Sequence, residues 1–317
     1  MNTPNEKPLL IIAGPTAVGK TEASILLAQE LKAEIVSADS MQIYRGMDIG
    51  TAKPTKEQRS LVLHHMIDIV DPDQPYSVGD YLRDARAVID RIRAAGKTPI
   101  VVGGTGLYIR ALTRGLFEGP PADPELRERL VQRGTEGQPG SLYAELAKLD
   151  PEAATKIHPN DLRRTIRALE VYYLRDRKIS SLQLEHGFQD RPYRFTLLFL
   201  ERSRQELYAR VEQRVDQMIA DGLEAEVKTL MDRGYGPELP SMKALGYQHF
   251  MASNLGNQSR DEALAFLKRD TKRFAKRQFT WFRREPEAVW VDVSGLSDSR
   301  EIAERIKKNI EISNNLV

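Results

Sequence analysis

The stretch Leu9-Leu-Ile-Ile-Ala13, followed at once by Gly14-Pro15-Thr16-Ala17-Val18-Gly19-Lys20-Thr21, decides the fold of this chain. The first five residues form a short apolar run typical of a buried strand, and residues 21–32 carry apolar side chains at helical spacing. Between them stands a complete G-x-x-x-x-G-K-[ST] motif, in the strand-to-helix context that this motif requires. We therefore expect residues 14–21 to form a phosphate-binding loop.

The chemistry of that loop follows from its residue types. Its glycines let backbone N–H groups turn inward around phosphate oxygens at the start of a helix. Lys20 supplies a positive charge and the Thr21 hydroxyl reaches Mg²⁺, the metal ion that we expect here. Such a loop binds a diphosphate group and does not contact a base, so the motif alone does not identify the rest of the ligand. ATP therefore remains an alternative ligand of this loop.

Strand and helix patterns alternate along much of the chain. Further strand patterns cover residues 34–38, 66–70, 98–102, 194–200 and 289–293, and helical patterns cover residues 78–95 and 204–231. This alternation predicts an α/β fold in which helices cover both faces of a parallel sheet, as in P-loop NTPases.

One part of the chain carries no strand pattern. Between residues 119 and 190 we expect helices only, at residues 124–133, 141–149 and 161–174. We therefore predict an all-helical insertion domain at 119–190. The core domain would consist of residues 1–118 and 191–317 and include basic C-terminal helices.

Composition excludes several classes of protein. The chain has 317 residues and no cysteine, and its five histidines lack metal-binding spacing, so any metal ion is expected to be held by oxygen ligands. No apolar run approaches the ~18 residues of a membrane span, and Met1 to Pro8 lack an export signal. We expect a monomeric cytoplasmic protein without membrane contact. The net charge of +2 requires any polyanion site to come from local clustering.

Two polar residues follow predicted strands. Asp39 ends the run Ile35-Val-Ser-Ala-Asp39, where a carboxylate serves a metal ion or acts as a general base, although it could also cap a helix starting near Ser40. Thr105 lies in Gly103-Gly-Thr-Gly106, which is no dinucleotide fingerprint because Ile109 replaces the third glycine. The Thr105 hydroxyl would point into the same crevice as the phosphate loop, and a tight turn without a ligand fits the spacing equally well.

Basic residues cluster in two segments. Arg163, Arg164 and Arg167 share a helix in the insertion, where they could clamp phosphates or form a solvated face with Arg167 paired to acids. A second helix carries basic side chains at i, i+3, i+4, i+7 and i+8, namely Arg269, Lys272, Arg273, Lys276 and Arg277. This stripe would be about 12 Å long and suits a nucleic-acid backbone, with a solvated face as the alternative.

Five motifs in order resemble one known family, the bacterial tRNA dimethylallyltransferases. They are Gly14 to Thr21, Asp39-Ser-Met-Gln42 with Tyr44 to Lys53, Gly103-Gly-Thr-Gly-Leu-Tyr108, Arg163-Arg-Thr-Ile-Arg-Ala-Leu-Glu170 and Lys276-Arg-Gln-Phe-Thr-Trp-Phe-Arg283. The similarity runs from about Leu9 to Asp292. It implies transfer of a dimethylallyl group from dimethylallyl diphosphate to N6 of adenosine 37, beside the anticodon of tRNAs that read codons beginning with U.

The resemblance also implies roles for single residues. Asp39 would accept the N6 proton, Thr105 would donate to the bridging oxygen of the diphosphate, and Arg127 would assist the chemistry. Lys20 and Mg²⁺ at Thr21 would neutralise the diphosphate, and the adenine would be flipped out of its stack. Contacts with the tRNA anticodon stem-loop would come from Asp39, Ser40, Met41, Gln42, Arg163, Arg164, Thr165, Ile166, Arg167, Lys243, Gly246, Tyr247, Lys276, Arg277, Gln278, Trp281 and Arg283.

Three other functions compete. A metabolite kinase would use the same loop, Asp39 and an arginine lid, but leaves the stripe at 269–284 unexplained. A prenyltransferase of free AMP or ADP shares the motifs but needs neither the stripe nor the insertion. A non-catalytic RNA-binding module has no use for Lys20, Thr21 and Thr105 in one crevice.

Overall fold

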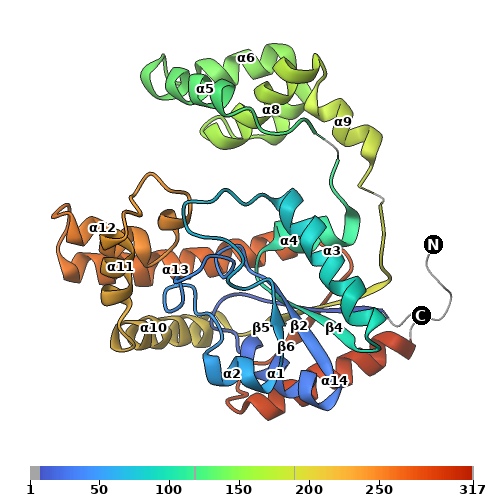
Figure 1. The fold of residues 1–317 in the computed structure, drawn as a ribbon. Coiled ribbons are helices and arrows are strands. Elements are labelled where there is room, and N and C mark those ends of the chain that lie inside the picture. Colours follow the sequence, from blue (N-terminus) through green and yellow to red (C-terminus); the bar gives the residue numbers. More distant parts are fainter. Residues whose placement is uncertain (1–7, 118, 189, 316–317) are drawn as a thin grey trace. The chain divides into compact units, whose positions relative to one another are not determined.

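The computed structural model describes residues 8–117, 119–188 and 190–315 and divides into two compact units. The larger unit is Met1–Thr113 with Pro192–Val317, and the smaller is Arg114–Arg191 (Figure 1). Met1 to Lys7, inspected above for an export signal, lie outside the described residues, and so does Glu118, which ends the first expected core segment. Among the described residues, no helix is long and apolar enough to span a membrane.

A six-stranded parallel sheet forms the centre of the larger unit, in the order β3-β2-β4-β1-β5-β6. The strands are β1 (Leu9–Ala13), β2 (Ala33–Ala38), β3 (His64–His65), β4 (Thr98–Gly103), β5 (Phe195–Glu201) and β6 (Ala288–Asp292). Because the strands are parallel, the loops that leave β1, β2 and β4 lie at one edge of the sheet. The α/β fold expected from the sequence is confirmed.

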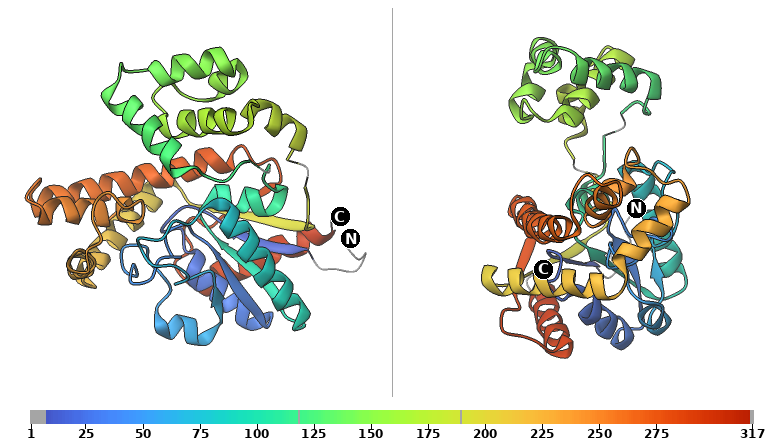
Figure 2. Two further views of the ribbon diagram at one scale, coloured as in Figure 1. Left: turned by 45° about the horizontal axis from the view of Figure 1, so that its top comes forward. Right: turned by 90° about the vertical axis from the view of Figure 1, so that its left-hand side faces the viewer.

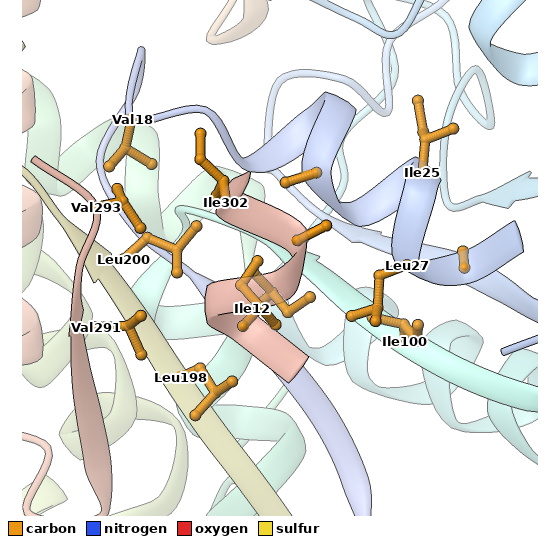
Figure 3. Packing of buried hydrophobic residues seen from close by; sticks show 14 of the residues in the cluster. Ile12, Val18, Ile25, Leu27, Ile100, Leu198, Leu200, Val291, Val293 and Ile302 are labelled. Atoms are coloured by element: carbon orange, nitrogen blue, oxygen red, sulfur yellow. The ribbon is translucent and has the colours of Figure 1, made fainter. Parts of the chain in front are cut away.

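Helices cover both faces of this sheet, as parallel strands require. On one face lie α1 (Lys20–Glu30) and α14 (Ser299–Asn315). Figure 3 shows Ile12, Ile100, Leu198 and Val291 from four neighbouring strands in one apolar cluster with Leu27 of α1 and Ile302 of α14. Successive strand residues point to opposite faces, so Leu9 and Ile11 pack on the other side, with α3 (Val78–Ala94), α4 (Gly106–Arg114) and the end of α13 (Arg260–Phe282).

A second group of helices extends the larger unit. It consists of α10 (Arg204–Ala220), α11 (Leu223–Asp232), the 3₁₀ turn η1 (Ser241–Lys243) and α12 (Tyr247–Asn254), which pack with the first half of α13 around a core of their own. Figure 2 shows α13 leaving this orange group and continuing to the sheet. The short α2 (Lys56–Leu61) lies before β3. The single helix predicted over 204–231 is wrong, because Gly222 at φ 98° divides it.

The smaller unit contains helices only, within its described residues. They are α5 (Pro124–Glu136), α6 (Ser141–Leu149), α7 (Pro151–Lys156), α8 (Leu162–Arg175) and α9 (Ile179–His186). Asp123, Asp150 and Asp161 cap three of these helices by accepting backbone N–H bonds, which explains where the helices begin. Leu130, Leu146 and Leu169 belong to an apolar core within this unit.

The strand predicted at residues 66–70 is wrong. Met66 and Asp68 have φ of 62° and 56°, a left-handed conformation that ends the pairing with β2 after His65. The Asp68 carboxylate accepts bonds from Lys53 and Arg59, both 2.6 Å long, which hold the chain in this turn. The apolar run at 66–70, interrupted only by Asp68, therefore belongs to an ion-paired loop.

We expect Gly103→Ala to destabilise the protein. A Cβ at this position would overlap the backbone of Ala38 on the adjacent strand, and overpacking of this kind costs about 1–3 kcal/mol. Gly79→Ala is the control, because Gly79 is exposed in α3 and its Cβ meets only Ser77 Oγ at 3.5 Å. Gly79→Ala should be neutral or stabilise by up to about 1 kcal/mol. Urea unfolding measures both, and equal midpoints would contradict this account.

Candidate active site

The loop between β1 and α1 has the conformation of a phosphate loop. Gly14 and Gly19 have φ of 156° and 108°. A Cβ on Gly14 would lie 2.9 Å from the carbonyl oxygen of Leu200, and one on Gly19 would lie 3.0 Å from Ile302 Cδ1. Both positions therefore require glycine. Gly19 caps α1 without a side-chain bond, which leaves the N–H groups of the first turn available to an anion.

Lys20 reaches back over this loop. Its Nζ donates to the carbonyl oxygens of Gly14 at 2.8 Å and Pro15 at 2.7 Å. Burial, together with the charge of Arg214, lowers the pKa of Lys20 to about 7, and the charge of Asp39 opposes this change. A bound diphosphate would favour the charged form of Lys20 and raise its pKa.

We expect diphosphate binding to be coupled to protonation of Lys20. Above pH 7 part of the free protein carries neutral Lys20, so a ligand that raises this pKa takes up a proton. Titration calorimetry with inorganic diphosphate at pH 8, in buffers of different ionisation enthalpy, measures this uptake. Lys20→Arg is the matched control, because arginine stays charged and leaves only the proton changes of the ligand. Equal uptake in both proteins would contradict the coupling.

The loops that follow β2 and β4 bring Asp39 and Thr105 together. The Thr105 N–H donates to the Ala38 carbonyl oxygen at 3.1 Å, and its Oγ1 accepts from the Ser40 N–H at 3.0 Å. Asp39 Oδ1 accepts from the Met41 N–H at 2.9 Å, an Asx turn with no helix after it, so the helix-capping alternative is wrong. Thr105 therefore directs a hydroxyl at the loop that carries Asp39.

Burial raises the pKa of the Asp39 carboxyl above 3.8, although the Met41 N–H and the charges of Lys20 and Arg214 oppose the rise. A carboxyl whose pKa is raised in the folded protein keeps its proton where the unfolded chain has lost it. Its contribution to stability therefore falls as the pH rises from about 3.8 towards the raised value. A buried carboxylate of this kind is a suitable proton acceptor.

We expect Asp39→Asn to gain stability relative to the unmodified protein as the pH rises from 4 to 7. The amide has no proton to lose, so the pH-dependent cost of ionising Asp39 disappears. Urea unfolding at several pH values measures the difference in free energy of unfolding. Asp73→Asn, in an exposed loop, is the control. A pH-independent difference for Asp39→Asn would show that burial does not raise this pKa.

The glycine loop, residues 103–106 at the end of β4, packs against α13. The side-chain amide of Gln278 donates to the Gly104 carbonyl oxygen and accepts from the Thr16 N–H, both at 3.0 Å. A Cβ on Gly104 would overlap Gln278, and one on Gly106 would overlap the ring of Trp281. These two glycines therefore make room for α13, and Gln278, expected to contact tRNA, is a buried link between the two loops.

The amide of Gln42 is also used within the protein. It donates to the carbonyl oxygens of Thr51 at 3.4 Å and Ala52 at 3.3 Å, and its Oε1 accepts from Ser37 Oγ at 3.1 Å. Gln42 thereby connects the Asp39 loop with the segment from Tyr44 to Lys53. Ser40 and Met41, beside it, are half-exposed.

Glu226 of α11 binds the backbone of the segment from Tyr44 to Lys53. Its carboxylate accepts the N–H groups of Asp48, Ile49 and Gly50 at 2.9 to 3.1 Å and the Tyr247 hydroxyl at 2.5 Å. Tyr247 is fully buried at the start of α12, Gly246 before it is buried too, and Lys243 is exposed on η1.

One residue of the site escaped the sequence analysis. Arg214 of α10 has a buried Nε without a hydrogen-bond partner among the described residues, and its charge acts on both Lys20 and Asp39. Burial lowers the pKa of Arg214, and Asp39 opposes this. Its signal was its position on the buried face of α10, since Arg214 lies seven residues after Leu207 and three after Val211, which are both buried.

Two family models match this chain. The one described as isopentenyl transferase covers residues 7–63, and the one described as IPP transferase covers residues 42–285, well over half of the chain. The chain belongs to the IPP transferase family. The resemblance seen in the sequence motifs is confirmed.

Curated relatives in this family match nearly the whole chain. A tRNA dimethylallyltransferase of Syntrophobacter fumaroxidans is 52% identical over 288 residues, which is 90% of this chain and 84% of the relative. Another, of Thermotoga maritima, is 50% identical over 302 residues, 95% of this chain and 97% of the relative.

Solved structures of the family agree with the fold. A full-length tRNA isopentenylpyrophosphate transferase from Bacillus halodurans is 39% identical with a TM-score of 0.68, covering 98% of this chain and all of that one. A eukaryotic dimethylallyltransferase acting on tRNA is 30% identical with a TM-score of 0.81, covering 98% of this chain and 79% of that one.

The basic stripe of this IPP transferase family member is partly neutralised by acids of a second helix, in addition to Asp270, the one acidic residue within the stripe itself. Lys268 and Lys272 pair with Asp216 and Glu212 of α10, and Asp270 pairs with Arg269 and Arg273. The exposed cations without a carboxylate partner among the described residues lie further along, at Lys276, Arg277, Arg283 and Arg284. Trp281 lies close to them in the chain. The Arg110 guanidinium makes a cation–π contact with the Trp281 ring, 4.6 Å from the ring centroid.

In the smaller unit, two arginines share one buried acid. Glu170 is fully buried and pairs with Arg127 at 2.8 Å and Arg167 at 2.5 Å. For Arg167 the structure agrees with the second interpretation given in the sequence analysis, in which this side chain pairs with an acidic residue. Arg164 pairs with Asp161, while Arg163 is exposed. The side chains of Thr165 and Ile166 are buried in this unit. The assignments of all these residues to catalysis or tRNA contact stay predictions.

Proposed function

We propose that this protein transfers a dimethylallyl group from dimethylallyl diphosphate to N6 of adenosine 37 in tRNAs that read codons beginning with U. One observation carries the proposal. The anion-binding loop at 14–21 and the Asp39–Thr105 pair lie at one edge of the sheet, and Gln278 connects their loops. The printed names of the curated relatives support the same reaction.

The reaction exchanges one bond for another. The bond from the allylic carbon to the bridging diphosphate oxygen breaks as N6 bonds to that carbon, and the N6 proton passes to Asp39. Lys20 and the N–H groups of the loop stabilise the charge on the departing diphosphate, and the Thr105 hydroxyl donates a hydrogen bond to the bridging oxygen while keeping its proton. Arg127 would assist from the smaller unit. Flipping the adenine out of its stack would give N6 access to the site.

The residues present fit a magnesium ion held mainly by the substrate. The Thr21 hydroxyl makes no hydrogen bond with a described residue, and no cluster of three acidic or histidine ligands occurs among the described residues. Thr21 would therefore contribute one ligand and the diphosphate oxygens the others. Bound Mg²⁺ supplies charge neutralisation of the leaving group. ATP would occupy the same loop only through its phosphates.

The tRNA substrate requires a surface for its backbone. Lys276, Arg277 and Arg283 expose cations at the end of α13 that is next to the glycine loop, and we assign them to phosphates of the anticodon stem-loop. Arg163 would add a contact from the smaller unit. We further propose that the protein works as a monomer in the cytoplasm.

The direct test is a transfer assay with nucleoside mass spectrometry. Purified protein, Mg²⁺ and dimethylallyl diphosphate are incubated with unmodified tRNA that carries adenosine at positions 36 and 37, beside AMP and ATP-only controls. We expect a dimethylallyl mass on tRNA adenosine alone. Asp39→Ala should lose at least about 100-fold in rate and keep diphosphate affinity. Labelled AMP, ATP turnover without prenylation, or full activity of Asp39→Ala would each contradict the proposal.

We expect the two halves of α13 to contribute differently to tRNA affinity. Lys276→Gln should lower the slope of log affinity against log salt by about 1, because one phosphate contact is lost. Lys272→Gln, on the same helix, should lower it by clearly less, because Lys272 is already paired with Glu212. Filter binding between 50 and 200 mM salt measures both slopes. Equal slopes in the two variants would show that the whole stripe contacts RNA.

A further inference from the structure

Four carbonyl groups of the phosphate loop are bonded to cationic side chains. Lys20 takes the carbonyls of Gly14 and Pro15, as described above. The carbonyl oxygens of Ala17 and Val18 accept hydrogen bonds from two arginines that have no role in the proposed reaction.

Arg202, directly after β5, holds the carbonyl oxygen of Val18. Its side chain is fully buried, and its Nε donates to Val18 at 2.9 Å. The two terminal nitrogens are fixed as well, one to Glu206 and one to the Leu296 carbonyl at 2.8 Å. Arg202 therefore ties the loop to α10 and to the segment before α14.

Arg210, one turn before Arg214 on α10, holds the carbonyl oxygen of Ala17 at 3.0 Å. Ala17 has a φ of 64°, which is unfavourable for a residue with a Cβ. A bond to its carbonyl keeps the peptide in the orientation that this conformation requires. Unlike Arg202, Arg210 is half-exposed.

The consequence follows from the geometry of the peptide bond. In a trans peptide the C=O and the following N–H point in opposite directions. An arginine that holds the Val18 carbonyl on the outer side of the loop therefore directs the Gly19 N–H away from that arginine, towards the mouth of the loop. The Ala17 carbonyl and the Val18 N–H are related in the same way, and in this structure this N–H donates to the Pro15 carbonyl oxygen at 3.4 Å.

We propose that Arg202 and Arg210 are positioning residues that hold the phosphate loop from its outer side, so that its N–H groups face the diphosphate before the substrate arrives. The inference deepens the proposed function and rests on it. Neither arginine touches the substrate in this account. Each acts through the loop, and loss of either should weaken diphosphate binding without weakening tRNA binding.

The test measures affinity for inorganic diphosphate by titration calorimetry and affinity for tRNA by filter binding. Arg210→Met keeps the aliphatic stem and loses the bond and the charge, whereas Arg210→Lys keeps the charge and loses the guanidinium geometry. Arg204→Met is the matched control, since Arg204 lies on the same helix and stacks on Tyr208. Arg202→Lys is made in parallel.

We expect both Arg210 variants to bind diphosphate about tenfold more weakly, the range for loss of a hydrogen bond with a charged partner, and Arg204→Met to match the unmodified protein. Affinity for tRNA should stay unchanged in all three. Hydrogen exchange at Val18 and Gly19 should rise in Arg210→Lys. Should Arg202→Lys fail to fold, the half-exposed Arg210 still decides the question.

Two results would overturn the inference. Diphosphate affinity unchanged in both Arg210 variants would show that the loop needs no outer support. Full affinity in Arg210→Lys with a loss in Arg210→Met would show that charge acts and position does not. Failure of the proposed function is distinguishable, because it would appear as unmodified protein that binds diphosphate but prenylates no tRNA.

Discussion

The side-chain amide of Gln278 holds the two loops of the active edge at a fixed separation. It accepts from the phosphate loop and donates to the glycine loop, and the glycine loop in turn fixes the segment that carries Asp39 through Thr105. The proposed diphosphate and adenine sites thus belong to one hydrogen-bonded unit. Only an uncharged side chain with a donor and an acceptor satisfies both backbone groups, which excludes glutamate and lysine at this position.

The sequence indicates most of the fold because its strongest patterns are local. The apolar runs at β1, β2 and β4 and the motif at 14–21 determine their own structure, so the parallel sheet follows from them. The errors occur where tertiary contacts override a pattern. Residues 66–70 form a short apolar run like that of a strand, yet Asp68 accepts bonds from Lys53 and Arg59 in a turn. The helical spacing across residues 204–231 conceals the break at Gly222.

For the site, sequence motifs identify the residues better than their roles. Asp39, Thr105 and Lys20 are found because each follows a strand or completes a loop motif. Gln278 and Gln42 belong to recognised motifs, but the motifs do not reveal that their amides bond to backbone groups. Those of Gln278 lie 262 and 174 residues away in the chain, and those of Gln42 lie 9 and 10 residues away. Similarly, the sequence around the basic stripe on α13 shows only Asp270 as an acidic partner. The other acidic partners, Asp216 and Glu212 of α10, are distant in sequence.

The hydrogen bonds of Gln278 to the phosphate loop and the glycine loop also matter during synthesis of the chain. The phosphate loop leaves the ribosome first, whereas its partner lies 262 residues later and α14, which packs against the loop, follows that. Strand β5, which pairs with β1, is also made late. In a nascent chain the proposed diphosphate site therefore stays incomplete until Gln278 and α14 have been translated, so occupancy of the site by substrate stabilises only chains that include them.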